Sequence, residues 1–381
     1  MLKSRIKDIW IYIEVLLIIL LSVSPLLTRN ISILLILFLL ALELLTYINK
    51  FDNKRFKLDK SIIAIIIVFA IAMVLDLRNL TFGATYSMVN FMYPCYFVCG
   101  YFIAKNIGKQ KFYKVFENIM FIVAILSLIG MSIYYISPKI IRSFPTYYFN
   151  DRTHRTIYFF NYIFEDDWMN VRNSGIALEP GLFMVILNIA LNLAIRNSDK
   201  KKLFFRVLVY GVAIILTRST IGYFVFLINI LTLIKKDKKY LILVVLLVIS
   251  LSTLISAEIV YQLEYKLSGS TSFDARFSPM VKAFNSSWYL PFGIGSTKYN
   301  VVYEALNLGS FDSWTQILLR FGFLTLFCVL ERIFKIYKKD GRTLAIILIM
   351  CFFSQPIWGY LLFTVMYYIE EDTLERNENE H

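Results

Sequence analysis

Long apolar runs with few charges recur along this 381-residue chain and are separated by polar connections. About 20 apolar residues suffice for a helix to cross a bilayer. The pattern therefore predicts an all-α polytopic membrane protein with about twelve transmembrane helices, or eleven if the last two runs are continuous. The predicted spans are 9–27, 31–49, 61–75, 83–104, 115–137, 176–195, 203–217, 220–234, 240–258, 313–334, 343–355 and 357–369.

The last two spans are separated by Gln355 and Pro356. Proline interrupts a helix interior, and the combined apolar run is longer than one crossing needs. We therefore expect a helical hairpin broken at this dipeptide.

Composition and charge place the whole chain in the membrane. Apolar residues make up 58% of the sequence and the mean hydropathy is +0.63, which excludes a soluble domain. With the N-terminus in the cytoplasm, the predicted inner segments hold 26 of the 40 Lys and Arg, as the positive-inside rule requires. The net charge of +13 is mainly this inner decoration, so we expect the lipid bilayer, and no nucleic acid, as the partner of the basic residues.

Cysteine and histidine are too few and too scattered for several kinds of chemistry. All four cysteines fall inside predicted spans, and the two histidines are His154 and His381. This distribution argues against a disulfide scaffold and against a Cys/His zinc site. We expect no metal and no cofactor.

Two outer connections, 138–175 and 259–312, are much longer than a link between neighbouring helices requires. Long loops on a rigid scaffold commonly carry function. We therefore expect a single integral membrane domain, 1–381, in which these loops and the adjoining helix mouths form the active site.

The first long loop interleaves arginines with aromatic residues and ends in the motif RNSGIALEPG, Arg172–Gly181. We expect the following hydrophobic helix to begin near Ile176. An interfacial aromatic belt would explain the aromatic residues. It would not explain why Arg172 and Glu179 occur together at a membrane border, where charges are costly. A binding site would explain them, because a guanidinium can bind phosphate oxygens through paired hydrogen bonds.

The second long loop contains DARFSPM, 274–280, and the glycine-rich WYLPFGIGSTKY, 288–299. Directly after it, Asp312, Gln316 and Arg320 are four residues apart and predict one polar stripe descending a helix. Charges at this depth normally face protein or a water-filled cavity. For Arg320, a structural ion pair and a functional role are both left open.

A third outer element is the tight turn TRST, 217–220. Together with RNSGIALEPG, with Arg276 preceding PFGIG at 291–295, and with FDSWTQILLRFGF at 311–323, it resembles the Wzy-type O-antigen and capsular polysaccharide repeat-unit polymerases and the superfamily they share with O-antigen ligases. The resemblance runs over most of residues 140–340. It rests on the order, spacing and common outer-face location of the motifs.

The resemblance implies a metal-independent glycosyltransferase of the GT-C type in the bacterial cytoplasmic membrane, with its active site on the periplasmic or extracytoplasmic face. Its substrate would be undecaprenyl-pyrophosphate-linked oligosaccharide, and the growing chain would pass to a sugar hydroxyl on a second lipid-linked repeat unit. Arg172, Arg218 and Arg276 would bind the pyrophosphate and stabilise the leaving group. Whether a chain-length regulator also binds the spans is left open.

The acceptor hydroxyl needs a general base, for which Glu179 and Asp312 are both candidates. The alternative function is that of a ligase. Many ligases of the superfamily show a histidine where this chain has Asp312, and this difference favours the polymerase. A flippase or transporter is a further alternative, but related halves and midplane charges, which are typical of transporters, are not evident in the sequence.

Overall fold

The computed structural model describes residues 2–24, 29–50, 58–77, 89–149, 152–157, 161–166, 170–237, 281–285, 290–299 and 312–369. The predicted span 240–258, the candidate Arg276 and the acidic C-terminal tail lie outside these residues.

Helices lie at every predicted span within the described residues. Four of them are long and apolar enough to cross a membrane: Ile31–Asn49, Lys60–Leu77, Lys109–Ile136 and Pro180–Asn197. The chain is thus a mostly helical protein with the helices of a membrane protein, whereas the total number of spans stays a prediction. The larger helices are α1 (Leu2–Val23), α2 (Arg29–Lys50), α3 (Lys60–Leu77), α4 (Val89–Ile107), α5 (Lys109–Ile136), α7 (Pro180–Asn197), α8 (Lys200–Leu216), α9 (Thr220–Lys236), α14 (Gly322–Asp340), α15 (Arg342–Ser354) and α16 (Leu361–Tyr368).

Contacts between Cα atoms divide the chain into two compact units that alternate along the sequence. Unit 1 comprises Met1–Thr28 and Gln110–Tyr261, and unit 2 comprises Arg29–Lys109 and Gln262–His381. Each unit contains one of two polar clusters that include candidate residues.

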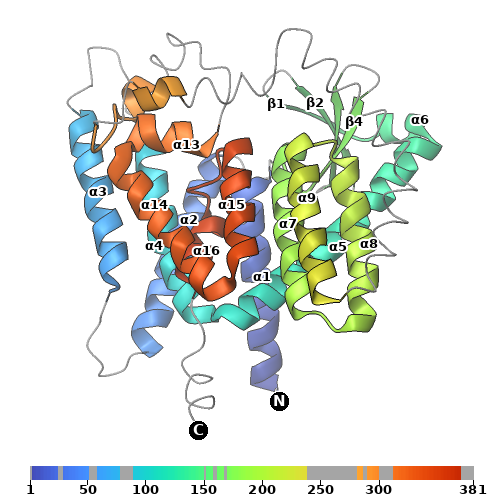
Figure 1. Ribbon diagram of the computed structural model, residues 1–381, viewed down its shortest axis with the longest axis horizontal. Helices are drawn as coiled ribbons and strands as arrows, with labels where there is room; N and C mark the ends of the chain where they lie inside the picture. The colour runs from blue at the N-terminus through green and yellow to red at the C-terminus, as the bar shows by residue number, and fades with distance from the viewer. Residues whose placement is uncertain are drawn as a thin grey trace. The chain divides into compact units, whose positions relative to one another are not determined.

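Helix α7 is the centre of unit 1 and packs against α8 and α9, which stand beside it in Figure 1. Its residues from Pro180 to Ile195 are all buried. Three buried asparagines join α7 to α9: Asn229 donates to the Asn188 side chain (3.2 Å) and accepts from Asn192 (3.0 Å). Hydrogen bonds between side-chain amides can hold helices together inside a membrane, where the hydrophobic effect does not drive their association.

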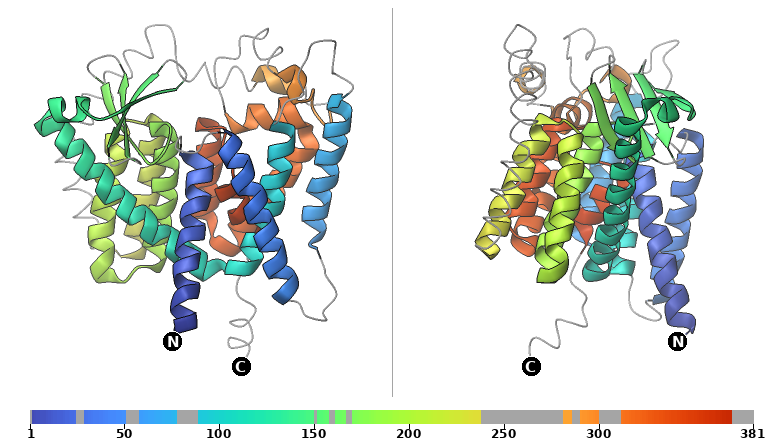
Figure 2. Two further views of the ribbon diagram at one scale, coloured as in Figure 1. Left: turned by 180° about the vertical axis from the view of Figure 1, so that it is seen from behind. Right: turned by 90° about the vertical axis from the view of Figure 1, so that its right-hand side faces the viewer.

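The first long loop contains a small sheet, which we did not expect in a chain that is otherwise mostly helical, as predicted. Four antiparallel strands follow the short helix α6 (Pro138–Arg142) in the order β1-β2-β3-β4. Figure 2 shows the sheet at one end of the α7–α9 group, where β4 contacts α7 and α8. The Thr, Tyr, Phe and Ile residues that we expected to form an irregular aromatic loop are typical strand formers. The strands are β1 (Thr146–Phe149), β2 (Arg152–Ile157), β3 (Asn161–Asp166) and β4 (Asn170–Gly175).

Unit 2 has an aromatic core around Trp358, whose side chain is fully buried. The Tyr93 ring of α4 stacks on Trp358 at 4.7 Å between centroids, and Phe97, Phe69 and Phe321 surround the pair. Edge-to-face and offset-stacked contacts of this kind add to the burial energy of each ring. They join α3, α4 and the C-terminal helices.

The predicted break at Gln355–Pro356 is confirmed, because α15 ends at Ser354 and α16 begins at Leu361. The hydroxyl of Ser313 donates to the carbonyl of Gln355 (2.6 Å) and accepts the N–H of Ile357 (2.9 Å). These bonds satisfy backbone groups that proline and the turn leave without helical partners.

The chain reverses at this break, as expected for a hairpin. Ser313, which contacts the turn, precedes α14 in the chain, whereas the guanidinium of Arg332, in the second half of α14, lies 4.6 Å from the ring centroid of Tyr368. Helix α16 therefore runs back along α14, while α15 approaches the turn from Arg342.

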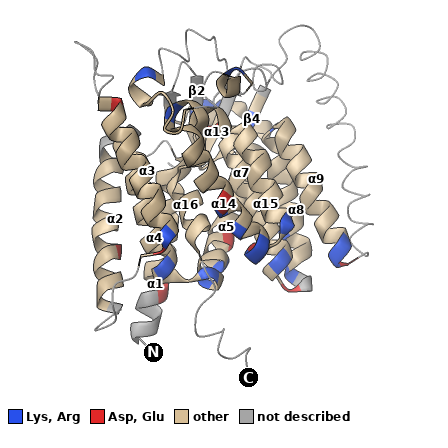
Figure 3. Cartoon of the chain, turned by 60° about the vertical axis from the view of Figure 1, so that its left-hand side comes forward, with Lys and Arg blue, Asp and Glu red and all other residues tan. Residues whose placement is uncertain are grey.

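Several helices end in basic residues, which Figure 3 marks in blue. In unit 1 they include Arg196 in the last turn of α7, and Lys235 and Lys236 in that of α9. In unit 2 the last turn of α14 carries Lys338 and Lys339. Lysine and arginine at helix C-termini interact favourably with the helix dipole, in addition to any interaction with lipid headgroups.

Candidate functional site

Arg172 lies on strand β4 and bonds to the turn between α8 and α9. Its Nε donates to the carbonyl of Thr217 (2.9 Å) and its Nη2 to the carbonyl of Arg218 (3.3 Å). A planar guanidinium is suited to such a paired contact. Two motifs that are 45 residues apart in the sequence, RNSG and TRST, are thus in direct contact within unit 1.

Arg218 has an unusual backbone conformation at the centre of this contact. Its φ is +49°, and it is the one non-glycine residue with positive φ in the described part of the chain. The left-handed conformation costs a residue with a Cβ about 1–2 kcal/mol. Strain of this kind persists only where the surroundings enforce it, and it concentrates at functional sites.

Helix α7 begins at Pro180, not near Ile176, so Arg172 is not at its entrance. The side chain of Asn173 accepts the N–H of Gly175 (3.1 Å), and this local bond favours a turn over a helix. Gly175 has φ +50°, and a Cβ there would lie 2.2 Å from the ring of Phe183. The sequence therefore forms a tight turn between β4 and α7.

Glu179 occupies the N-cap position of α7, directly before Pro180 at the first helical position. Its carbonyl accepts the N–H groups of Leu182 and Phe183, but its carboxylate forms no capping hydrogen bond. The carboxylate of Glu179 therefore does not act as the side-chain cap of α7.

In unit 2, Asp312 precedes the short helix α13 (Ser313–Gln316), which continues into the π-helical turn η2 (Ile317–Phe321). Its Oδ1 accepts the N–H of Thr315 (2.8 Å), as an N-cap does. Its Oδ2 is buried and forms no hydrogen bond. Burial raises the pKa of this carboxyl group, although the bonds from Thr315 oppose the effect. A raised pKa is typical of a carboxylate that acts as a general base.

The helix that follows Asp312 is broken at Gly322, whose φ is +79°. The break leaves backbone groups unpaired, and the segment 290–294 satisfies them. The N–H of Ile294 donates to the carbonyl of Leu319 (2.7 Å), and the N–H of Phe323 donates to the carbonyl of Leu290 (3.3 Å). Broken helices inside a membrane require this kind of replacement partner.

The glycines of PFGIG permit this close approach. A Cβ on Gly293 would lie 2.6 Å from the carbonyl oxygen of Leu319, and one on Gly322 would lie 2.3 Å from the nitrogen of Gly293. The motifs PFGIG and FDSWTQILLRFGF, like the pair in unit 1, therefore contact each other directly. Arg276, which precedes PFGIG in the sequence, lies outside the described residues.

Sequence reasoning missed Asp76, at the end of α3. This carboxylate is almost fully buried and accepts from both the N–H (3.2 Å) and the hydroxyl (2.8 Å) of Thr297. A Cβ on Gly295 would collide with it at 2.0 Å. The acid at the edge of an apolar span was a visible signal, but its partner is more than 200 residues away in the sequence.

The expected polar stripe of Asp312, Gln316 and Arg320 is present, and all three side chains are buried. The hydroxyl of Tyr93 donates to Gln316 Oε1 (3.2 Å), and the guanidinium of Arg320 lies 4.1 Å from the ring centroid of Tyr299. The stripe therefore joins α4 and the segment after PFGIG to one helix of unit 2.

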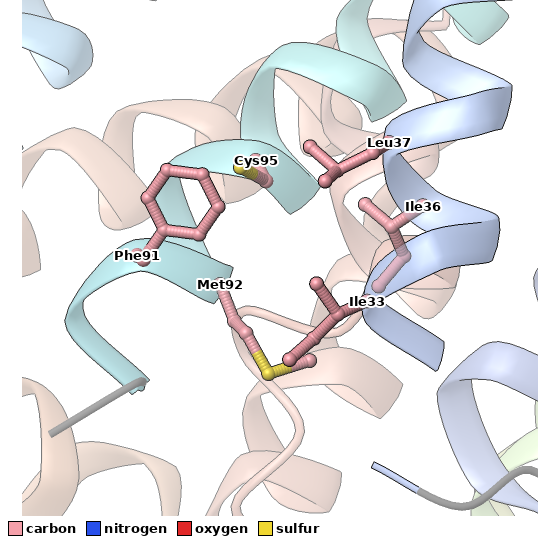
Figure 4. Close-up of a pocket in the computed structure, with 6 residues that line it drawn as sticks. All are labelled: Ile33, Ile36, Leu37, Phe91, Met92 and Cys95. Carbon is pink, nitrogen blue, oxygen red and sulfur yellow. The ribbon is translucent and has the colours of Figure 1, made fainter. Parts of the chain in front are cut away.

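A small hollow between α2 and α4 has different chemistry. It is lined by Ile33, Ile36, Leu37, Phe91, Met92 and Cys95, all of them apolar apart from the thiol (Figure 4). Nothing in this lining could orient a charged substrate. Within the described ranges, no group of three His, Cys, Asp or Glu side chains lies close enough together to hold a metal ion.

The two polar clusters, Arg172 with the TRST turn in unit 1 and Asp312–Arg320 with its neighbours in unit 2, are the candidate functional sites. No protein-family model, curated protein or solved structure matches this chain.

Proposed function

We propose that this protein is a membrane glycosyltransferase that polymerises the repeat units of an O-antigen or capsular polysaccharide. It transfers a growing glycan from undecaprenyl pyrophosphate to a sugar hydroxyl of another lipid-linked repeat unit, on the outer face of the bacterial cytoplasmic membrane. The observation that carries the proposal is the contact of Arg172 with the strained turn at Arg218. It joins two of the motifs that resemble those of the polymerases.

In this reaction the acceptor hydroxyl attacks the anomeric carbon of the donor sugar. A new glycosidic C–O bond forms as the bond to the pyrophosphate breaks, and undecaprenyl pyrophosphate leaves with the electron pair. The hydroxyl proton passes to a base. We assign leaving-group binding to Arg172, Arg218 and Arg276, because fixed cations stabilise negative charge that develops in a poorly hydrated site.

Asp312 is the preferred base. Its buried Oδ2 has no hydrogen bond, and burial raises its pKa, so the group is suited to accept a proton. Glu179 is retained as the second candidate, because its carboxylate is not committed to capping α7.

The first experiment compares undecaprenyl-pyrophosphate-linked glycans from a strain lacking the protein with those from strains producing wild type, Arg172→Ala or Arg172→Lys. We expect single repeat units to accumulate without polymer in the deletion strain and in the Ala variant. The Lys variant keeps the charge but loses the paired contact to Thr217 and Arg218, so at most partial extension is expected.

Arg29→Ala is the matched control, because this arginine lies outside the four motifs. Normal polymer from Arg172→Ala, at an unchanged protein level, would remove Arg172 from the site. Long lipid-linked chains that never reach a final acceptor would identify a ligase. An unchanged outward-facing glycan pool in the deletion strain would contradict both glycosyltransferase functions.

A further inference from the structure

Arg320 differs from the other buried cations of the described residues in having no acidic partner. Three Lys or Arg residues in these ranges are buried: Lys109, Arg320 and Arg332. Lys109 pairs with Asp340 at 3.0 Å, and Arg332 pairs with Glu331 at 3.0 Å. Arg320 is 8% exposed, and no described carboxylate lies within ion-pair distance of it.

The contacts of Arg320 hold its guanidinium in place without neutralising it. One face lies over the ring of Tyr299 at 4.1 Å, an attractive but weak cation–π contact. The hydroxyl of Tyr93, which donates to Gln316, is also a hydrogen-bonding and electrostatic neighbour of the guanidinium, but it carries no charge that could neutralise it. The Nε atom is buried and forms no hydrogen bond. The tyrosine ring covers one face of the planar guanidinium, whereas the N–H groups point outward in its plane. The edge of the guanidinium can therefore still donate hydrogen bonds.

A second polar group, in the same helical turn as Tyr299, has no partner. Ser296 precedes Tyr299 by three residues in the helical segment 296–299, so both lie on the same side of that turn. Its hydroxyl is buried and forms no hydrogen bond. A buried charge without an acidic partner is costly, and the buried hydroxyl of Ser296 without a hydrogen bond adds to the cost. Both costs are removed if an anion with several acceptor oxygens binds here.

We propose that Arg320, together with Ser296 and the aromatic side chains of Tyr299 and Tyr93, forms a phosphate-binding site in unit 2. A phosphate presents two oxygens to the edge of a guanidinium and further oxygens to a hydroxyl. Phosphate is also the principal anionic group available to a residue in a membrane helix. That the phosphate belongs to the lipid-linked sugar donor rests on the proposed function, whereas phosphate binding itself does not.

The test uses the full chain in phosphatidylcholine nanodiscs. Radiolabelled inorganic pyrophosphate and, separately, undecaprenyl phosphate detected by native mass spectrometry are titrated against wild type, Arg320→Met and Arg342→Met. Arg342 is the matched control, because it also lies over a tyrosine ring, at 5.8 Å, but is exposed. We expect Arg320→Met to weaken binding of at least one probe by tenfold or more, and Arg342→Met to bind as wild type does.

The probe that binds more tightly identifies the source of the phosphate, either free in water or carried on a lipid. Failure of both probes to bind wild type, or equal binding by Arg320→Met, would overturn the proposal. If the wild type binds phosphate but does not extend glycans, the proposed function alone would be contradicted.

Thermal stability distinguishes a binding role from a structural one. A buried cation without an acidic partner destabilises the protein when no ligand is bound. We therefore expect Arg320→Met, without ligand, to melt at the same temperature as wild type or at a higher one. A lower melting temperature together with unchanged binding would make Arg320 structural. If Arg320→Met does not fold, protection of wild-type Arg320 from phenylglyoxal by pyrophosphate replaces the comparison, and absence of protection with either probe contradicts the site.

Discussion

Individual polar side chains define the candidate functional sites of this protein. Arg172 uses two of its donors on carbonyl groups of a turn, which fixes the backbone of Arg218 in a conformation it would not adopt alone. Asp312 uses one oxygen to cap a helix and leaves the other without a hydrogen bond. In Asp312, therefore, one oxygen positions the side chain, and the other is the one that we propose accepts the proton.

Asp312→Asn separates these two roles of the carboxylate. Asparagine caps helices about as well as aspartate, so the bond to Thr315 is expected to survive. The variant should lose at least 100-fold in glycan-extension rate, since base catalysis contributes about 10²–10⁴-fold. Initial rates in proteoliposomes with purified lipid-linked repeat unit check this expectation, with Asn173→Asp, which lies outside the base position, as a charge-change comparison.

The pH dependence of the wild type follows from the same group. The pKa of Asp312 is raised by burial, so its carboxylate is protonated, and inactive as a base, at pH values where an exposed aspartate would still be ionised. A raised folded-state pKa also means that ionisation of Asp312 disfavours folding as pH rises through that value. Asp312→Asn should accordingly melt no lower than wild type at neutral pH. A clearly lower melting temperature would show that the charge is needed for folding.

At the scale of elements, the notable feature is a helix broken at Gly322 and completed by the segment 290–294. Three backbone hydrogen bonds cross this contact: Ile294 donates to Leu319, Phe323 to Leu290, and Leu324 to Pro291. Discontinuous helices in membranes commonly mark binding sites, because the break exposes backbone groups and permits sharp changes of direction.

Gly322→Ala tests how much this contact contributes. A Cβ would be strained at φ +79° and would lie 2.3–2.5 Å from Gly293, Pro291 and Leu290. Gly341→Ala is the control, since Gly341 has φ +86° but no atom within 4 Å of the added Cβ. We expect the Gly322 variant to lower the melting temperature and the folded yield in size-exclusion profiles clearly more than the Gly341 variant. Equal effects would mean that backbone strain alone matters.

Helix positions could be predicted from sequence because apolar run length is a local property. The proline break at Gln355–Pro356 was readable for the same reason. The sheet from Thr146 to Gly175 was not, since its short strands alternate polar and aromatic residues in a way that an interfacial loop also does. Asp76 and the break at Gly322 depend on partners far away in the chain, at Thr297 and Leu290, which no local pattern reveals.

At the scale of the whole molecule, the proposed reaction requires the sheet and its end of the helices to face away from the cytoplasm. This orientation rests on the positive-inside distribution of lysine and arginine. In a variant with Cys95, Cys99, Cys328 and Cys351 replaced by alanine, a single new cysteine at an exposed position reports the side. We expect a membrane-impermeant maleimide to label Ser143→Cys in intact cells but Lys202→Cys only after permeabilisation.

Both positions are exposed and belong to unit 1, so the pair differs in the end of the helices at which each lies. The reversed labelling pattern would place the candidate residues on the cytoplasmic side. It would remove the proposed donor, which is an outward-facing lipid-linked glycan, from their reach.

The alternation of the two units along the sequence has a consequence for biosynthesis. Helices α3 and α4 leave the ribosome before most of unit 1, yet their aromatic residues pack on Phe321 and Trp358, which are synthesised near the end of the chain. The early helices must therefore insert into the bilayer with Tyr93 and its neighbours unpacked, and these residues are buried only after the C-terminal hairpin has been synthesised. A nascent chain stalled between the two halves would present these rings to membrane chaperones and quality-control proteases.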